Sequence, residues 1–311
     1  MIIFLEWRYK FILKSNNYFL SNILLDSSLI SRTNYSGHTI KVIQCGEHFQ
    51  VYKYSEEHYK KNKKSEKIKD KKIDSNFRNI IYGKDEIKDI DTDNLHKENN
   101  FVNKDELKEI EYKNIMRSKF QLQRLVKANE SEFKTFITLT FAENVTSIEE
   151  ANQMFDNWRR SIKRIKSDFK YVCVPEFQKR GAVHYHLLTN LDIKKDDNII
   201  ILQNGKDKMY DVKYWNKGFT SVFNLENMNV VGYITKYMNK TIDNRLFSKR
   251  RYLYSRNLNQ PVVSYINLSN IYEFKQYIEI LGYDKIYESD YLDNFGEVIE
   301  FKEYKKSHHI N

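Results

Sequence analysis

The sequence has few of the residues that form covalent or metal-bound cross-links. Its 311 residues include only two cysteines, Cys45 and Cys173, which lie too far apart in the chain to form the closely spaced pair of a zinc or redox motif. Cys173 lies within an apolar run, where a thiol is more often a small apolar filler than a reactive group. Nothing in the sequence therefore requires an oxidising compartment.

Long apolar segments are missing as well. The chain begins Met-Ile-Ile-Phe-Leu, but charged residues interrupt this segment from Glu6 onward. A signal peptide carries its charges before the apolar stretch, and a membrane-spanning helix needs about 20 apolar residues. We therefore expect a soluble intracellular protein without a membrane partner.

A phosphate-binding P-loop is the third absence. No Gly-x-x-x-x-Gly-Lys-[Ser/Thr] segment occurs, so the chain carries no recognisable ATP-driven helicase. There is also no internal repeat of domain size. A length of 311 residues suits one sizeable domain with extensions, or two small domains.

Positive charge and aromatic rings are abundant. The 52 lysines and arginines outnumber the 42 acidic residues, which gives a net charge of +10 and favours a polyanionic partner such as nucleic acid. The 23 tyrosines and 19 phenylalanines are interleaved with lysines, a composition that suits stacking on unpaired bases. For any single ring, a place in the apolar core is the commoner alternative.

The chain divides by composition into four segments. Apolar residues are sparse and charges dense in the second segment, which is typical of a linker or a solvated helix, and the third segment carries all the motifs described below. The segments are residues 1–52, small and without an assigned role; 53–116, the charged linker or solvated helical region; 117–261; and 262–311, a C-terminal extension.

Hydrophobic periodicity predicts an α+β fold for the third segment. Alternating apolar residues predict strands, and apolar stripes at helical spacing predict helices. Thr146 and Ser147 each precede a glutamate by three residues, as in the capping box that begins a helix. The expected order is a helix over 105–128, a strand over 136–141, a helix after Ser147, paired strands over 171–177 and 182–188, a strand over 219–223, and a final helix. This order predicts a central, mainly antiparallel sheet with helices packed on one face.

His184 and His186 are separated by one residue in a predicted strand. Residues i and i+2 of a strand point to the same face, so both imidazoles project together, and Glu176 on the partner strand can supply a carboxylate. Two imidazoles and a carboxylate suit an open site for zinc, manganese or magnesium. For phosphate chemistry we favour Mg²⁺ or Mn²⁺ as a Lewis acid. Glu143 or Asp192 could replace Glu176, and the histidines could simply fill a strand face.

A second pattern is a four-residue unit written twice. Tyr233, Lys236, Tyr237 and Lys240 fall within an arc of about 100° on a helix. A phenol is a poor nucleophile near its free pKa of about 10, and neighbouring ammonium groups favour its phenolate form. Two phenols and two ammonium groups aimed at one phosphate would suit phosphoryl transfer. The alternative is a pair of core aromatics with lysines that extend to solvent.

These motifs resemble those of the HUH endonucleases, in particular the two-tyrosine rolling-circle replication initiators of small circular single-stranded DNA phages and plasmids. Residues 136–141 match the first motif of that family, 183–188 the metal-binding motif, and 232–240 the tyrosine motif. Weaker support comes from residues 215–218 and 254–258. The resemblance covers residues 117–261 and implies an RRM-like, ferredoxin-like nuclease domain.

The resemblance also implies a mechanism. One tyrosine would cut single-stranded DNA at a replication origin and form a 5′-phosphotyrosine link, while the free 3′-OH primes a host DNA polymerase. The second tyrosine would then cut the regenerated origin, so that the released 3′-OH closes the displaced circle. Lys236 and Lys240 would neutralise the phosphate, with Lys236 the first choice, and His184, His186 and Glu176 would hold the metal. A host helicase would unwind the duplex in the cytoplasm of a bacterial cell.

Other functions stay open on the sequence. A relaxase of the same superfamily usually has three histidines and tyrosines that precede them, and a single-tyrosine transposase lacks the second tyrosine. Both therefore fit this chain less well than an initiator. A member of a different class, a non-catalytic origin-binding DNA protein, would keep the fold without using the tyrosines.

Overall fold

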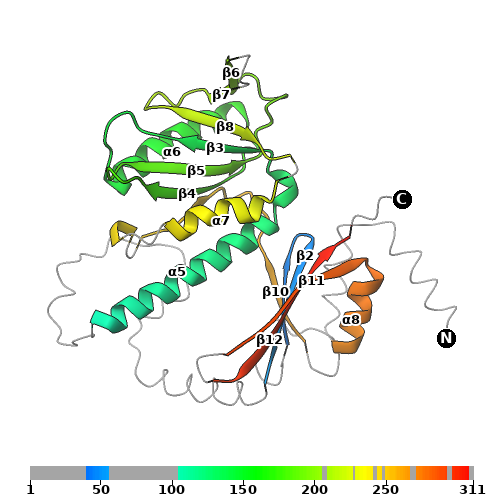
Figure 1. The fold of residues 1–311 in the computed structure, drawn as a ribbon. Helices are drawn as coiled ribbons and strands as arrows, with labels where there is room; N and C mark the ends of the chain where they lie inside the picture. Colours follow the sequence, from blue (N-terminus) through cyan, green and yellow to red (C-terminus); the bar gives the residue numbers. More distant parts are fainter. Residues whose placement is uncertain are drawn as a thin grey trace. The chain divides into compact units, whose positions relative to one another are not determined.

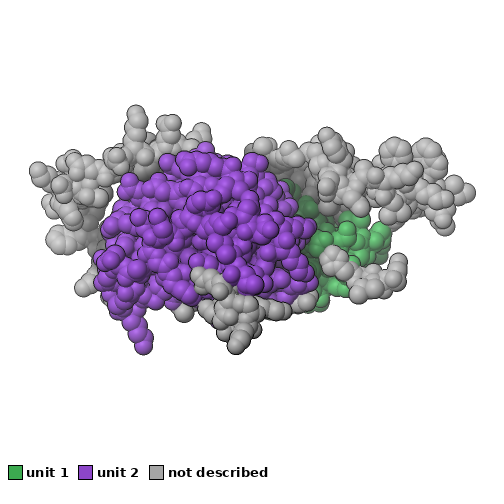
Figure 2. Space-filling view, turned by 90° about the horizontal axis from the view of Figure 1, so that it is seen from above, with its two compact units in different colours: residues 1–100, 262–311 green, residues 101–261 purple. Residues whose placement is uncertain are grey.

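A computed structural model describes residues 40–55, 104–204, 209–226, 228–240, 244–246, 249–266, 271–292 and 296–307 (Figure 1). The chain forms two compact units, residues 101–261 and residues 1–100 together with 262–311 (Figure 2). Most of the predicted N-terminal segment 1–52 and of the predicted charged region 53–116 lies outside the described residues. The predicted α+β class is confirmed, because both units combine an antiparallel sheet with α-helices.

The unit of residues 101–261 is built on a seven-stranded sheet with the strand order β6-β7-β8-β3-β5-β4-β9. All of its paired strands are antiparallel. The strands are β3 (Thr135–Leu139), β4 (Tyr171–Phe177), β5 (Val183–Thr189), β6 (Ile200–Asn204), β7 (Met209–Val212), β8 (Thr220–Asn224) and β9 (Leu253–Tyr254), and the helices are α5 (Lys104–Lys127), α6 (Ile148–Ile165) and α7 (Val230–Lys240). Short 3₁₀ turns lie at Glu130–Glu132 and Asn244–Leu246.

Helix α6 covers one face of this sheet. Its N-cap is Ser147, whose side-chain oxygen accepts a hydrogen bond from the Glu150 backbone N–H, so the predicted capping interaction is present at this residue. The buried side chains of α6 recur every three or four residues and form one stripe. They pack on the inward-facing residues of the strands, among them Ile137, Tyr185 and Leu187. The stripe consists of Ile148, Ala151, Phe155, Trp158 and Ile162.

Helices α5 and α7 pack on the opposite face, so the prediction that helices cover only one face is wrong. Leu122 of α5 and Ile234 of α7 share a core with Phe136, Val172 and the neighbouring strand residues. Figure 1 shows the two helices side by side. The physical reason lies in β4, where five consecutive residues are buried. A strand with apolar residues on both faces needs cover on both.

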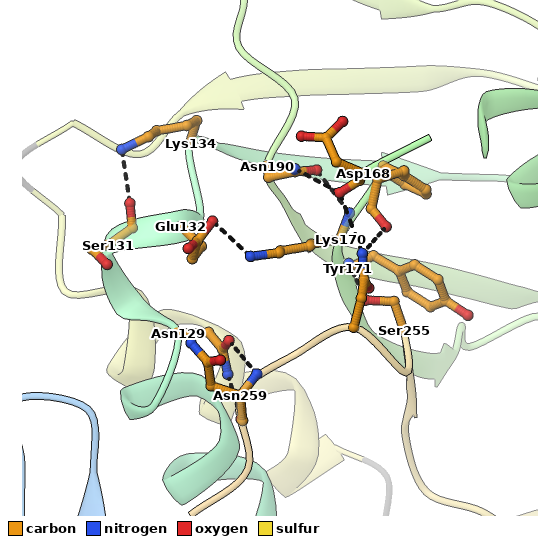
Figure 3. A network of polar contacts seen from close by, with 12 residues as sticks. Asn129, Ser131, Glu132, Lys134, Asp168, Lys170, Tyr171, Asn190, Ser255 and Asn259 are labelled. Carbon is orange, nitrogen blue, oxygen red and sulfur yellow. Dashed lines mark hydrogen bonds and ion pairs between the residues drawn. The ribbon is translucent and has the colours of Figure 1, made fainter. Parts of the chain in front are cut away.

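Polar contacts at one end of the sheet tie α5 and the segment after β9 to the strands (Figure 3). The buried Asn129 amide donates to the carbonyls of Leu125 (2.8 Å) and Asn259 (2.9 Å) and accepts from the Asn259 N–H (2.8 Å). Ser255 exchanges hydrogen bonds with the Tyr171 backbone. The segment 254–258, which gave weak support to the family resemblance, therefore serves here to complete the sheet edge.

The second unit contains a five-stranded sheet with the order β10-β1-β2-β12-β11 and helix α8 (Ile271–Ile280). Its core includes Phe49, Ile278 and Tyr304. The strands from the two ends of the chain pair directly, since β1 pairs with β10 and β2 with β12. The sequence alone did not indicate this pairing. The strands are β1 (Ile40–Cys45), β2 (His48–Tyr54), β10 (Val262–Ile266), β11 (Tyr283–Leu292) and β12 (Val298–Lys306).

Both cysteines are free and buried, one in each unit. Burial raises the pKa of the Cys173 thiol well above its ordinary value, which suits the predicted role of an apolar filler. Among the helices of the described residues, none is both long enough and apolar enough to cross a membrane.

Gly218 marks a close approach between two loops. The Trp215 indole N–H donates to the Thr140 carbonyl (2.7 Å), and the Ala142 N–H donates to the Lys217 carbonyl (2.8 Å). A Cβ atom on Gly218 would lie 2.5 Å from the Thr140 oxygen and 2.6 Å from the Ala142 nitrogen. Segment 215–218 thus fixes the end of β3, and only glycine fits at its fourth position.

We expect Gly218→Ala to lower the free energy of unfolding by about 2 kcal/mol, because the new methyl group meets backbone atoms that cannot turn away. Urea unfolding followed by circular dichroism measures this. Gly232→Ala is the matched control, since its Cβ would meet only the Asn229 side chain, at 3.0 Å, and alanine favours the helix. Equal midpoints for the two variants would contradict the close approach.

Candidate functional site

The two histidines of β5 lie on the face of the sheet that α7 covers. His186 pairs in register with Thr138 of β3 on one side and with Val174 of β4 on the other. Val174 belongs to the core beneath α5 and α7, so His186 points to the same side. Tyr185 points the other way, into the core under α6, where its hydroxyl donates to the Asn152 side-chain oxygen (2.7 Å).

Glu176 is the cross-strand partner of His184. Its carboxylate accepts a hydrogen bond from Nε2 of His186 at 2.6 Å, and Nδ1 of His186 lies 3.3 Å from the Thr138 hydroxyl. If Nε2 carries the proton, Nδ1 accepts from that hydroxyl, and both ring nitrogens of His186 are oriented.

The two other carboxylates considered from the sequence lie elsewhere. Asp192 follows β5, and its carboxylate accepts from the Lys194 backbone N–H (2.8 Å). Glu143 is exposed in the loop after β3. Of the three candidates, Glu176 is the carboxylate that is hydrogen-bonded to a histidine of the site.

His184 is half-buried, and its environment favours the neutral imidazole. Burial, followed by the nearby His186, lowers the pKa of His184 to about 4, against a smaller raising effect of Glu176. The imidazole is therefore neutral at pH 7. Neutral imidazole is the form that binds metal ions.

The donor set suits a divalent ion in kind and in place, because two imidazoles and a carboxylate lie on one face of two adjacent strands. In the arrangement described, the donors do not converge, and no cluster of three or more His, Cys, Asp or Glu side chains within the described ranges is disposed to hold a metal ion. His186 and Glu176 bind each other instead, and the two imidazole centroids lie 6.4 Å apart. Metal binding would require this pair to exchange its hydrogen bond for bonds to the ion.

Helix α7 places both tyrosines against this face. The Asn229 side chain accepts from the Gly232 N–H (2.8 Å) and satisfies one of the N–H groups of the first helical turn. The Tyr237 ring stacks on His186, with centroids 3.7 Å apart and planes inclined by 24°. Tyr233 lies one turn earlier, and its ring centroid is 5.9 Å from that of Tyr237. The helix therefore brings the tyrosine and histidine motifs into direct contact.

Phe136 is the common support of these side chains, and sequence reasoning did not single it out. Its ring is almost fully buried and lies edge-on to Tyr233 (4.6 Å) and stacked with Tyr237 (5.5 Å) and His186 (5.8 Å). The available sign was its place in the motif strand 136–141. The register that sets Phe136 beside the histidines is decided only by strand pairing.

The environments of the two tyrosines differ. Burial raises the pKa of Tyr237 above its ordinary value, and the hydrogen bond with Tyr233 and the charge of Glu176 act in the same direction. Lys236 is exposed, and its Nζ lies 5.7 Å from the Tyr233 ring centroid, within range of a cation–π contact. Lys240 is the last residue of α7, and its predicted side-chain role lies outside the described side chains.

Two arginines, which the sequence did not single out, lie beside the β4–β5 turn. The Arg245 guanidinium lies 3.7 Å from the Phe177 ring centroid and donates to the Gly181 carbonyl (3.1 Å). Arg180 donates to the Phe141 carbonyl (2.9 Å), and its charge helps to lower the pKa of His184. Both therefore place positive charge near the strand end that carries Glu176.

The positive charge of the chain is confined to the unit that holds the site. Residues 101–261 contain 29 lysines and arginines against 19 acidic residues, whereas the other unit contains 23 of each. The net charge of +10 therefore belongs entirely to the unit with the histidines and tyrosines. A polyanionic ligand would be attracted to this unit.

We expect Phe136→Ala to lower the free energy of unfolding by about 3–5 kcal/mol, because it removes a buried ring that three other rings contact. Phe223→Ala is the matched control. Phe223 is the cross-strand partner of Phe136 but is 54% exposed, so its loss should change stability by no more than about 0.5 kcal/mol. Thermal unfolding of both variants measures the difference, and similar losses would argue against the buried packing of Phe136.

Comparison with known proteins gives one match. Residues 134–242 match a family of replication-associated proteins of the ORF2 type. The matched segment is a little over a third of the chain and contains Glu176, both histidines and both tyrosines. No curated protein and no solved structure matches the chain.

Proposed function

We propose that this protein initiates rolling-circle DNA replication as a metal-dependent, site-specific endonuclease and strand transferase for single-stranded DNA. The observation that carries this proposal is the contact between the two motifs, in which Tyr237 stacks on His186 and Tyr233 lies one helical turn away. The similarity of residues 134–242 to a replication-associated family supports the same conclusion. Basic charge confined to this unit supports DNA as the ligand.

In the proposed reaction, the hydroxyl oxygen of one tyrosine attacks a phosphodiester phosphorus. A bond forms between that oxygen and phosphorus, the bond from phosphorus to the 3′ oxygen breaks, and the phenol proton is lost while the 3′ oxygen gains one. The products are a 5′-phosphotyrosine and a free 3′-OH. A host polymerase would extend the 3′-OH, and a host helicase would open the duplex.

The second tyrosine would carry out the second cut. After one round it attacks the regenerated origin, and the 3′-OH released in that step attacks the first phosphotyrosine, which frees the first phenol and closes the circle. Side chains at i and i+4 of a helix lie on one face, so both hydroxyls can reach one phosphate by a small shift. Lys236 and Lys240 would neutralise charge on that phosphate.

His184, His186 and Glu176 would hold the divalent ion, for which Mg²⁺ or Mn²⁺ suits phosphate chemistry and zinc is a further possibility. When bound, the ion would supply Lewis-acid polarisation of a phosphate oxygen. The chain's own part is to keep the His184 imidazole neutral and to orient His186 between Glu176 and Thr138.

The Tyr233→Phe, Tyr237→Phe double variant should bind a labelled single-stranded oligonucleotide from its own replicon but form no covalent adduct, because phenylalanine lacks the attacking oxygen. Denaturing gel electrophoresis detects the adduct, and peptide mapping identifies the tyrosine that bears it. Cleavage by the double variant at the wild-type rate would refute the nickase and favour a non-catalytic DNA-binding protein.

Each single variant, Tyr233→Phe or Tyr237→Phe, should make the first cut less often or not at all, and neither should complete the release of a closed circle. Two-dimensional gel analysis of replicating plasmid DNA distinguishes a nicked, covalently bound intermediate from a closed product. Full circle release by both single variants would argue against alternation of the tyrosines.

His184→Ala and Glu176→Gln should each lower divalent-dependent cleavage by at least about 100-fold while leaving oligonucleotide binding largely intact, because each removes a metal ligand. Asp192→Asn is the control, since Asp192 lies in the loop after β5 and its hydrogen bond to the Lys194 N–H can be kept by an amide oxygen. Cleavage that persists in excess chelator would rule out the metal site.

A further inference from the structure

Strand β8 carries two exposed phenylalanines beside the site. Phe223 pairs in register with Phe136, and Ser221 pairs with Thr138, so Phe223 and Ser221 lie on the same face of the sheet as His186. Phe219 precedes the strand by one residue, and its carbonyl accepts from the Thr140 N–H, which continues the ladder. Phe219 is 56% exposed and Phe223 is 54% exposed, whereas Phe136 is 1% exposed. These two rings, Phe219 and Phe223, are named the aromatic shelf below.

The aromatic shelf is continuous with the tyrosine site. One row across the sheet runs from Phe223 through Phe136 to Leu188, and the next runs from Ser221 through Thr138 to His186. Neighbouring strands are about 4.8 Å apart, so β8 lies about 10 Å from β5. The two shelf residues are four positions apart, which is about 13 Å in an extended chain, enough for each ring to contact a different base.

Burial alone does not explain these two side chains. Alternate residues of β8 face the α6 core, where Val222 is buried, and the polar Ser221 lies between the two exposed rings. The net positive charge of this unit favours a polyanion over an apolar partner. An exposed aromatic pair in a basic unit is the combination that holds unpaired bases, because rings stack on bases while cations contact the phosphates.

We propose that Phe219 and Phe223 stack on bases of the single-stranded DNA that flank the phosphate cut at the tyrosine site. This proposal rests on the proposed function for the identity of the ligand. The shelf holds bases irrespective of their sequence, because every base has a face on which a ring can stack. It positions the strand, and it takes no part in the phosphoryl transfer.

The test measures binding of the full-length protein to a fluorescein-labelled 20-nucleotide single strand of mixed sequence by anisotropy, with chelator present so that no cleavage occurs. Phe219→Ala and Phe223→Ala should each weaken binding about tenfold, and the double variant about a hundredfold. Phe223→Trp should restore the affinity. On an oligonucleotide whose central nucleotides are abasic, wild type and double variant should bind equally, because there are no bases to stack.

Salt dependence separates stacking from charge. The slope of log affinity against log salt should be the same for wild type and the shelf variants, whereas losing a phosphate contact lowers it by about one. Leu202→Ala and Tyr272→Ala are controls, since both side chains are exposed and apolar. Leu202 pairs with Tyr210 of β7, which pairs with Val222, so it belongs to the other face of the sheet, and Tyr272 belongs to the other unit. Both variants should bind as wild type does.

Wild-type affinity in the double variant would overturn the shelf, and so would an equal defect on the abasic strand. A wild-type dimer in sedimentation that the double variant dissociates would assign this face to a second copy of the chain instead. The adduct assay keeps the two proposals apart. Normal binding by shelf variants of a protein that forms adducts refutes the shelf alone, while a shelf defect in a protein that forms none refutes the nickase alone.

Discussion

The pairing of β5 between β3 and β4 is the constraint on which the site depends. This register sets His186 opposite Thr138 on one side and Val174 on the other, and it sets Glu176 opposite His184. A shift of one residue would turn both imidazoles into the core under α6 and Tyr185 out of it. Tyr185 is fully buried and its hydroxyl is hydrogen-bonded, so the core itself resists such a shift.

Packing then links the sheet to the tyrosine helix. Phe136 contributes the surface on which Tyr233, Tyr237 and His186 rest, so the same ring supports residues from two motifs about fifty positions apart in the chain. The stacking of Tyr237 on His186 follows from this arrangement. A site assembled on a buried ring is held with little freedom, which is the requirement for placing a nucleophile near a phosphate.

The structure also divides labour between the two units. All the net positive charge, both histidines and both tyrosines belong to the unit of residues 101–261, while the other unit is electrically balanced. That second unit is made by pairing of strands far apart in the chain. Long-range pairing of this kind leaves no local pattern, because strand register depends on partners that the sequence does not name.

The sequence by itself determined the local features: the alternation that projects His184 and His186 together, the helical spacing of the two tyrosines, the Ser147 cap and the α+β class. Each depends on neighbours within a few residues, where periodicity and hydrogen-bonding chemistry suffice. Only the tertiary structure decided that α5 and α7 cover the second face and that Glu176 contacts His186. It also decided that Phe136 is buried while its partner Phe223 is exposed. These outcomes depend on which strand lies beside which and on which face a helix covers, and identical residue types in one chain cannot encode that choice locally.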